Sequence, residues 1–304
     1  MNSVSSLFII FIIVGIGFFC GKSKVLNTVQ SEGLELYLFK IAIPCYLFNA
    51  ILNHQFSDLI NVPYIYAYLV CFLIVALMTA AYFWNRCSLS NICINVLASG
   101  YVNAAIYTLP VITFLLGDPK AAILGNLIQV IIIQSIFITL LSFFKHQEKS
   151  IIKKLSITFK SPLIMIPIIG LAVNYFQLPM PSIITVITQN LGTGAASLSL
   201  FTFGLTLSNL NRQGLNKDLF FIILTKNILH PLIAVLIGFY IFNLEQYWLY
   251  SLIIATSAPT AFIVYLIAKQ FSTYENLVKL VITISSIISL ISLLVISQIM
   301  RILL

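Results

Sequence analysis

The chain has 304 residues, of which 60% are hydrophobic and only 8% are charged, and its net charge is +8. A soluble domain carries about 25% charged residues, so this composition excludes a water-exposed surface and predicts an all-α integral membrane protein. The five cysteines form no CxxC pair, which favours ordinary apolar packing, and we expect no metal site and no cofactor.

Apolar runs of spanning length recur along the whole chain. A helix needs about 20 residues to cross a bilayer. No Lys or Arg precedes the first run, which therefore reads as a spanning helix and not as a secretory signal peptide. The ten predicted spans cover residues 3–21, 33–53, 64–84, 95–117, 121–144, 161–177, 182–209, 218–240, 247–269 and 276–300.

The distribution of Lys and Arg predicts the orientation in the membrane. Twelve of the sixteen lie in the loops after the odd-numbered spans, two lie on the other side, and Lys40 and Lys226 fall inside spans. Because cytoplasmic loops carry the excess of basic residues, we expect a multi-pass protein of the cytoplasmic membrane with both termini extracytoplasmic. The same bias explains the net charge, so no nucleic-acid partner is needed.

A polar segment, "KHQEKSIIKKLSITFK", divides the chain into equal halves. Residues 1–144 precede it, residues 161–304 follow it, and each half contains five predicted spans. Five is odd, so a second copy that begins at a cytoplasmic linker (145–160) must be inverted relative to the first. Inverted five-helix repeats are a transporter architecture.

Two spans carry a proline at matching places in the two halves. Pro110 lies in the fourth span and Pro259 in the ninth. Matched prolines favour two discontinuous helices that cross near the midplane, where helix N-termini suit an anionic group. A pair of ordinary proline kinks is the alternative. The polar residues that would line such a crossover are Asn103, Thr108, Ser257 and Thr260.

Several motifs, in this order, resemble the auxin efflux carrier family in its shorter bacterial form. The second span "LYLFKIAIPCYLFNAI", the fourth "NAAIYTLPVITFLLGD", the seventh "LGTGAASLSLFTFGLTL", the eighth "KNILHPLI" and the ninth "SAPTAFIVYLIAKQF" are similar to the corresponding helices of that family. No single motif is specific, but their order and spacing together are, and the resemblance covers nearly the whole chain.

The resemblance implies a fold and a function. It implies ten helices in two inverted repeats, related to the sodium/proton antiporter fold, with a scaffold from helices 1, 2, 6 and 7 and a mobile transport domain from the rest. It also implies a homodimer and elevator-type transport of small organic anions, such as auxin-like acids or dicarboxylates, bound at the crossover of helices 4 and 9. The chain departs from the family pattern at Thr108, Ser197 and Ile263, of which the last two put the identity of the substrate in doubt.

Polar residues inside predicted spans are further candidates. Snorkelling to the cytoplasmic interface explains Lys40. Snorkelling is also open for Lys226, but Asn227 and His230 follow it, and this cluster favours charge compensation for an anion or proton coupling. Asn49 is a weaker substrate-binding candidate, for which interhelical hydrogen bonding is the ordinary interpretation. No pair of carboxylates lies inside a span, which disfavours a paired-Asp sodium site.

Three other functional classes compete with this reading. An anion channel would need a ring of charges or a filter-like repeat, and neither is evident. Another carrier, similar to the bile-acid/sodium symporters, is a second alternative. A membrane-embedded enzyme would need a nucleophile with a base, or a set of metal ligands, yet the three histidines lie in separate segments. We therefore expect no enzymatic activity.

Overall fold

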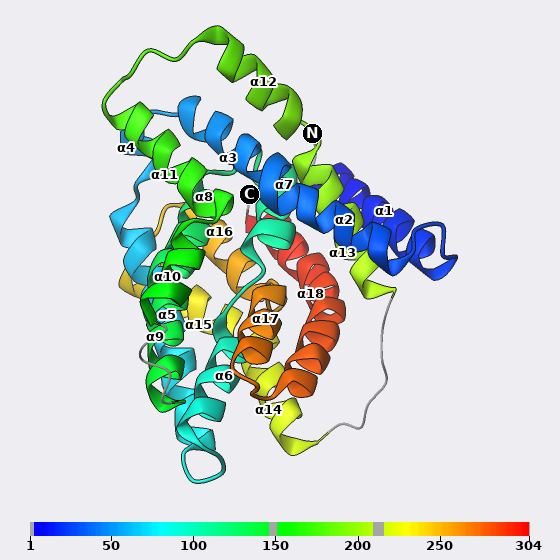
Figure 1. Ribbon diagram of the computed structural model, residues 1–304, viewed down its shortest axis with the longest axis vertical. Helices are drawn as coiled ribbons and strands as arrows, with labels where there is room; N and C mark the ends of the chain where they lie inside the picture. Colours follow the sequence, from blue (N-terminus) through cyan, green and yellow to red (C-terminus); the bar gives the residue numbers. More distant parts are fainter. Residues whose placement is uncertain (1–2, 146–150, 209–215, 304) are drawn as a thin grey trace. The chain divides into compact units, whose positions relative to one another are not determined.

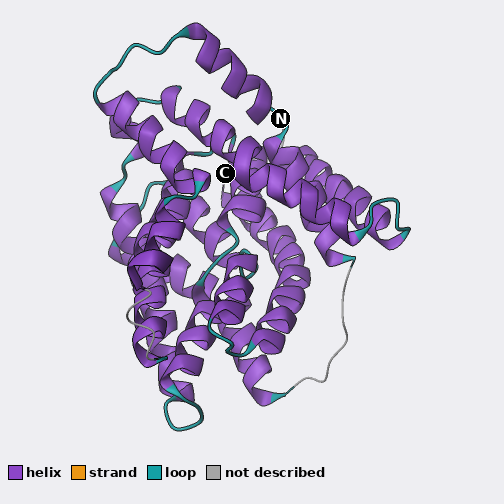
Figure 2. Cartoon of the chain, viewed as in Figure 1, coloured by secondary structure: helices purple, strands orange, loops and turns teal. Residues whose placement is uncertain are grey.

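The computed structural model describes residues 3–145, 151–208 and 216–303, and every regular element in these ranges is helical (Figures 1 and 2). Part of the predicted linker (146–150), Arg212 and Leu304 lie outside the described residues. The α-helices are α1 (Ser3–Lys22), α2 (Thr28–Tyr37), α3 (Ile43–Leu52), α4 (Phe56–Leu59), α5 (Val62–Phe83), α6 (Leu89–Gly100), α7 (Leu109–Leu116), α8 (Lys120–Leu127), α9 (Ser135–Phe144), α10 (Ile151–Phe159), α11 (Pro162–Tyr175), α12 (Ser182–Gly192), α13 (Ala195–Leu207), α14 (Lys217–Leu224), α15 (His230–Leu236), α16 (Gln246–Ser257), α17 (Phe262–Gln270) and α18 (Glu275–Leu303).

Segments of π-helix join several of these helices into longer rods. They cover Leu38–Ala42, Ala104–Thr108, Ile128–Gln134, Thr225–Leu229 and Ile237–Ile241. Three of them are followed directly by a residue and then a proline: Pro44, Pro110 and Pro231. Proline cannot donate to the carbonyl four residues earlier and its ring crowds that carbonyl. The wider π turn relieves this conflict, so the helix continues through the proline without a break.

Six helical stretches are long and apolar enough to cross a membrane, by length and composition: Ser5–Lys22, Val29–Leu52, Phe56–Phe83, Lys120–Phe144, Lys217–Ile241 and Glu275–Gln298. They coincide with the predicted spans 1, 2, 3, 5, 8 and 10. The other four predicted spans are shorter or interrupted. The sixth is the short helix α11, and the fourth, seventh and ninth are each divided in two.

The helices group into two compact units, and each unit takes segments from both halves of the sequence. The first unit contains Met1–Asn61, Ala105–Leu127 and Ser156–Asn209, and the second contains Val62–Ala104, Ile128–Leu155 and Leu210–Leu304. The compact units therefore do not coincide with the two predicted repeats. The first holds the predicted helices 1, 2, 6 and 7 together with the end of the fourth, and the second holds most of the others.

In the first unit, glycines bring α1 and α13 into close contact. A Cβ atom on Gly17 would collide with the carbonyl oxygen of Phe201, and one on Gly204 would collide with the carbonyl oxygen of Val14. Only glycine lets the two backbones approach to this distance, which is how small residues support helix association in a bilayer. This helix pair is a rigid part of the unit.

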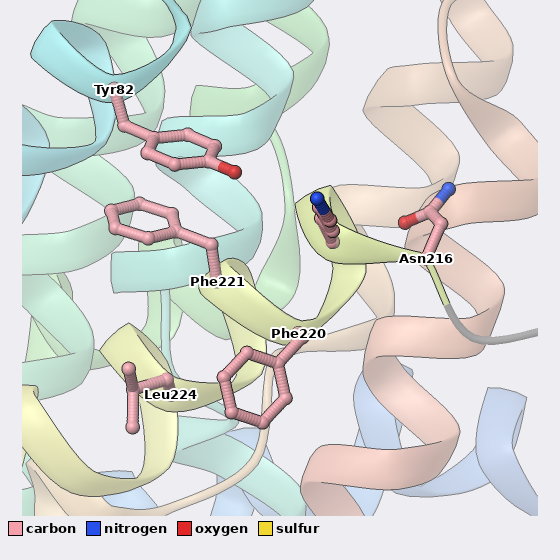
Figure 3. Close-up of a pocket in the computed structure, with 6 residues that line it drawn as sticks. Tyr82, Asn216, Phe220, Phe221 and Leu224 are labelled. Atoms are coloured by element: carbon pink, nitrogen blue, oxygen red, sulfur yellow. The ribbon is translucent and has the colours of Figure 1, made fainter.

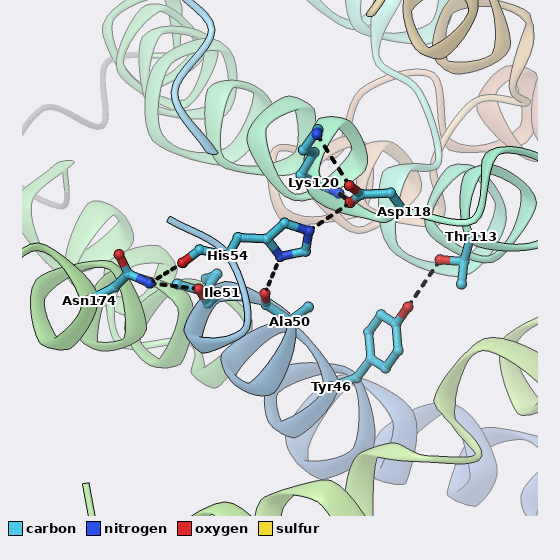
Figure 4. Close-up of polar contacts among 8 residues, drawn as sticks. All are labelled: Tyr46, Ala50, Ile51, His54, Thr113, Asp118, Lys120 and Asn174. Carbon is cyan, nitrogen blue, oxygen red and sulfur yellow. Dashed lines mark hydrogen bonds and ion pairs between the residues drawn. The ribbon is translucent and has the colours of Figure 1, made fainter. Parts of the chain in front are cut away.

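Polar contacts join the ends of several helices in the same unit (Figure 4). His54 Nε2 lies 3.1 Å from Asp118 Oδ1, and Lys120 Nζ lies 3.2 Å from Asp118 Oδ2. Asn174 donates to the carbonyl oxygens of Ile51 at 2.8 Å and His54 at 2.7 Å. These bonds fasten the loop after α3 to the loop after α7 and to the end of α11.

Candidate functional site

The fourth predicted span is broken at Tyr101–Asn103, between α6 and the π turn that begins at Ala104. Pro110 therefore does not open this helix, which corrects the sequence-based interpretation. It lies seven residues into the following helical stretch, where the π turn accommodates it. The ninth span is broken at Ala258–Ala261, so Pro259 does lie within its break. The prolines are consequently not equivalent in their roles.

The two broken segments pair with each other inside the second unit. Val102 and Thr260 form an antiparallel β-bridge. The N–H of Asn103 donates to the carbonyl oxygen of Pro259 at 2.8 Å, and the N–H of Ala261 donates to the carbonyl oxygen of Tyr101 at 3.3 Å. Extended backbone has no internal hydrogen bonds, and lipid supplies none, so this mutual pairing satisfies groups that a continuous helix would have satisfied itself.

Side chains from neighbouring helices form hydrogen bonds with the two paired segments. Gln129 accepts from the N–H of Val102 at 2.7 Å, and Gln134 accepts from the hydroxyl of Tyr101 at 3.0 Å. Ser285 Oγ accepts from the N–H of Thr260 at 3.1 Å. None of these three residues is among the predicted site residues. The sequence signal that could have identified Gln129 and Gln134 is a polar amide side chain inside an apolar span.

Two predicted binding hydroxyls are occupied within the protein. Thr260 Oγ1 donates to the carbonyl oxygen of Ala98 at 2.7 Å, and Ser257 Oγ donates to the carbonyl oxygen of Ile254 at 2.9 Å. Each hydroxyl has one proton, so neither can donate to a bound carboxylate in this conformation. Both side chains are buried, whereas Asn103 in the same unit is half-buried. Asn103 thus stays the better-placed polar candidate.

Lys226 is fully buried, beside the broken ninth span. Its ammonium donates to the carbonyl oxygen of Thr256 at 3.0 Å, near the end of α16. The ion pairs of the described residues involve Asp118 and Asp218, and none includes Lys226. A buried cation without a counter-ion is costly, so this position favours a bound anion or the exchange of a proton. Lys40, by contrast, is exposed, as snorkelling requires.

The residues next to Lys226 extend the polar cluster toward the crossover. Asn227 Nδ2 donates to the carbonyl oxygen of Ser285 at 3.2 Å and to Ser289 Oγ at 3.1 Å. Ser285 in turn accepts from Thr260, as described above. His230 Nδ1 is buried and has no partner among the described residues. Buried polar groups are usually satisfied, so an unpaired nitrogen in this cluster marks a place for a ligand, a proton or water.

The remaining candidates lie in the first unit. Thr108 and Pro110 are buried, and Asn49 Nδ2 donates to the carbonyl oxygen of Cys45 at 2.9 Å. This hydrogen bond lies within α3, so the Nδ2 group of Asn49 forms no interhelical contact through it. The predicted site residues are thus divided between the units: Asn103, Lys226, Ser257, Pro259 and Thr260 belong to the second.

The comparisons with known proteins identify the family. A family model described as "Membrane transport protein" matches residues 2–158 and, a second time, residues 145–297. The chain belongs to this family. It is the auxin efflux carrier family that the sequence motifs resemble. Membership of the membrane transport protein family, together with the six long apolar helices, makes the chain a multi-pass membrane transporter. A comparison with curated proteins gives no match.

Proposed function

We propose that this member of the membrane transport protein family is a secondary transporter of small organic anions. The observation that carries the proposal is the antiparallel bridge Val102–Thr260, which Ser285 joins by hydrogen bonds to Asn227. The neighbouring Lys226 is buried, donates to the carbonyl oxygen of Thr256 and has no ion pair among the described residues. Broken helices supply polar backbone inside the membrane, and a buried cation offsets the charge of a carboxylate.

The helix that follows the ninth-span break supports an anionic substrate. α17 begins at Phe262, and its N-cap residue, Ala261, provides no side-chain cap. The first N–H groups of a helix have no intrahelical acceptor and stand at the positive end of its dipole, so they attract negative charge. Asn103 would add an amide donor from the paired segment. Carboxylates of the auxin or dicarboxylate type fit this set of donors.

The mechanism that fits best is elevator-type alternating access, as the family resemblance implies. The crossover and Lys226 belong to the same compact unit, so one rigid body would move the anion. The predicted inverted five-helix repeats and the predicted homodimer are parts of this proposal. The alternatives are an anion channel, another carrier of the bile-acid/sodium-symporter type and, least favoured, a membrane-embedded enzyme.

Uptake into proteoliposomes tests the proposal. Purified protein is reconstituted and offered a panel of labelled organic acids, with and without a pH gradient. A carrier gives saturable uptake and accelerated exchange when unlabelled substrate is placed inside, whereas a channel gives neither. Stimulation by a pH gradient would indicate proton coupling. Uptake that neither saturates nor shows exchange for any acid in the panel would refute an organic-anion carrier.

A further inference from the structure

A pocket in the second unit is lined by none of the predicted substrate-binding residues. Its volume is about 690 Å³, and Figure 3 shows the side chains that line it. They come from the end of α5 and from the beginning of α14: Tyr82, Asn216, Lys217, Phe220, Phe221 and Leu224. The polar residues come from the first turn of α14 and its N-cap, and the apolar residues follow along that helix.

The predicted spans place the pocket between a membrane boundary and the apolar layer. Two of the long apolar stretches, Phe56–Phe83 and Lys217–Ile241, end beside it. Lys217 lies at the boundary, and Leu224 lies seven residues further along α14, which is about 10 Å at 1.5 Å per residue. The polar end therefore has the depth of lipid headgroups, and the apolar end has the depth of the first acyl carbons.

Two stacked rings form one wall of the pocket. Tyr82 and Phe221 are parallel, with ring centroids 3.8 Å apart and an interplanar angle of 5°. Phe220 belongs to the same helix and is 67% exposed, so its ring offers a contact surface to an acyl chain. The wall is thus rigid and apolar on the side that a hydrocarbon chain would contact.

The polar end carries an excess of positive charge. Arg86 lies over the Tyr82 ring at 4.2 Å, and its guanidinium is 3.7 Å from the carboxylate of Asp218. Lys217 takes part in none of the ion pairs of the described residues. This end of the pocket thus has two cations, Lys217 and Arg86, and one carboxylate, Asp218. The positive-inside count predicts that this end lies in the cytoplasmic leaflet, where anionic lipids attract basic residues.

We propose that this pocket binds one anionic phospholipid. The phosphate group contacts Lys217 at the membrane boundary, and an acyl chain lies along Phe220 and Leu224. A free phosphate ion would use the cation but not the apolar wall, and a zwitterionic lipid would use the wall but gain less from the excess charge. The site is independent of the proposed transport function, because neither Lys226 nor the crossover takes part in it.

Native mass spectrometry of the purified protein tests the proposal with three probes: phosphatidylglycerol, phosphatidylcholine with the same chains, and inorganic phosphate. We expect preferential retention of phosphatidylglycerol. Lys217→Gln should weaken phosphatidylglycerol binding about fivefold, which is the contribution of one basic residue at an anionic surface, and Lys217→Arg should restore it. Lys153→Gln is the matched control, because Lys153 is another exposed basic residue of the predicted cytoplasmic side.

A separate variant tests the contact between the acyl chain and the apolar wall of the pocket. Phe220→Ala should weaken the binding of both phospholipids, since it shortens the contact with the chain and leaves the charge unchanged. The proposal is overturned by equal retention of the two phospholipids, by binding of inorganic phosphate that displaces phosphatidylglycerol, or by equal effects of Lys217→Gln and Lys153→Gln. Both lysines are exposed, so their replacement leaves the fold intact. No transport is measured, so failure here says nothing against the carrier.

Discussion

The N–H of Asn103 donates to the carbonyl oxygen of Pro259 at 2.8 Å, although 156 positions separate the two residues in the sequence. Each of the two broken spans thus completes the backbone of the other. Because the pairing uses main-chain groups, side-chain replacements next to it can alter substrate binding without removing the bridge.

Asn103→Ala should weaken the binding of a carboxylate substrate while the protein stays folded. Loss of a hydrogen bond to a charged partner costs about 1.5–3 kcal/mol, so affinity should fall roughly 10- to 150-fold. The measurement is the concentration dependence of uptake in proteoliposomes. Unchanged half-saturation for every transported acid would place the substrate away from Asn103.

Pro259→Ala should reduce turnover more than Pro110→Ala. Pro259 lies within a break, and alanine there allows the helix to extend and compete with the bridge, whereas Pro110 lies in a helix that already continues through it. The initial rate of uptake per folded protein compares the two, with gel filtration as the check on folding. A larger loss in Pro110→Ala than in Pro259→Ala would contradict the revised role of Pro110.

Lys226→Ala should weaken anion transport or change its dependence on pH, and Lys40→Ala should do less. Lys226 is fully buried without an ion pair among the described residues, while Lys40 is exposed. Uptake of the preferred acid is measured between pH 5 and 8 for both variants. Equal and small effects would mean that Lys226 has only a structural bond to Thr256.

Gly204→Leu should destabilise the first unit strongly. A Cβ atom at Gly204 already meets the backbone of α1, and overpacking of a close helix contact typically costs about 1–3 kcal/mol or more. Gly15→Leu is the matched control, since no atom lies within 4 Å of its Cβ position. Thermal unfolding in detergent should separate the two variants by several degrees. Equal unfolding temperatures would refute the close approach of α1 and α13.

Asp118 should make stability depend on pH at the acidic end. Burial raises the pKa of its carboxyl group, but the N–H of Lys120 and the charges of His54 and Lys120 outweigh this, and the pKa is lowered below its usual value of 3.8. A lowered folded-state pKa means that the stabilisation is complete well above 3.8 and is lost as the pH falls through the folded-state value.

Asp118→Asn provides the comparison for this effect. At pH 6 we expect the variant to be less stable by about 1 kcal/mol, as for a partly exposed ion pair, and the difference should shrink below about pH 3.8. Thermal unfolding across this range measures it. A difference that is constant with pH would show that the carboxylate charge contributes nothing.

The predicted orientation has a direct test in reporter fusions. A reporter after Leu304 should be extracytoplasmic, and one inserted at Ser150 should be cytoplasmic, because the basic residues gather in the loops after odd-numbered spans. Alkaline phosphatase and a fluorescent protein report the two sides. Placement of both sites on the same side would exclude ten spans.

The sequence by itself determined the class of the molecule and its family. Composition required a membrane protein, because 8% charged residues cannot cover a surface in water, and the ordered motifs pointed to the family that the family model confirms. The spans 1, 2, 3, 5, 8 and 10 could be read from hydropathy alone, since a long apolar helix satisfies its own backbone and needs no distant partner.

The tertiary structure decided where the helices break and which polar groups already have partners within the protein. Pro110 looked equivalent to Pro259 in the sequence, but the π turn at Ala104–Thr108 absorbs it, and the break falls at Tyr101–Asn103 instead. Ser257 and Thr260 were predicted to donate to the substrate, but each hydroxyl donates instead to a backbone carbonyl oxygen. Three contacts join residues that are distant in sequence: the bridge Val102–Thr260, the bond from Lys226 to Thr256 and the bond from Thr260 to Ser285. The hydrophobic periodicity of one segment cannot predict such pairings, because their free energy depends on how helices pack against each other and not on the order of residues within a single helix.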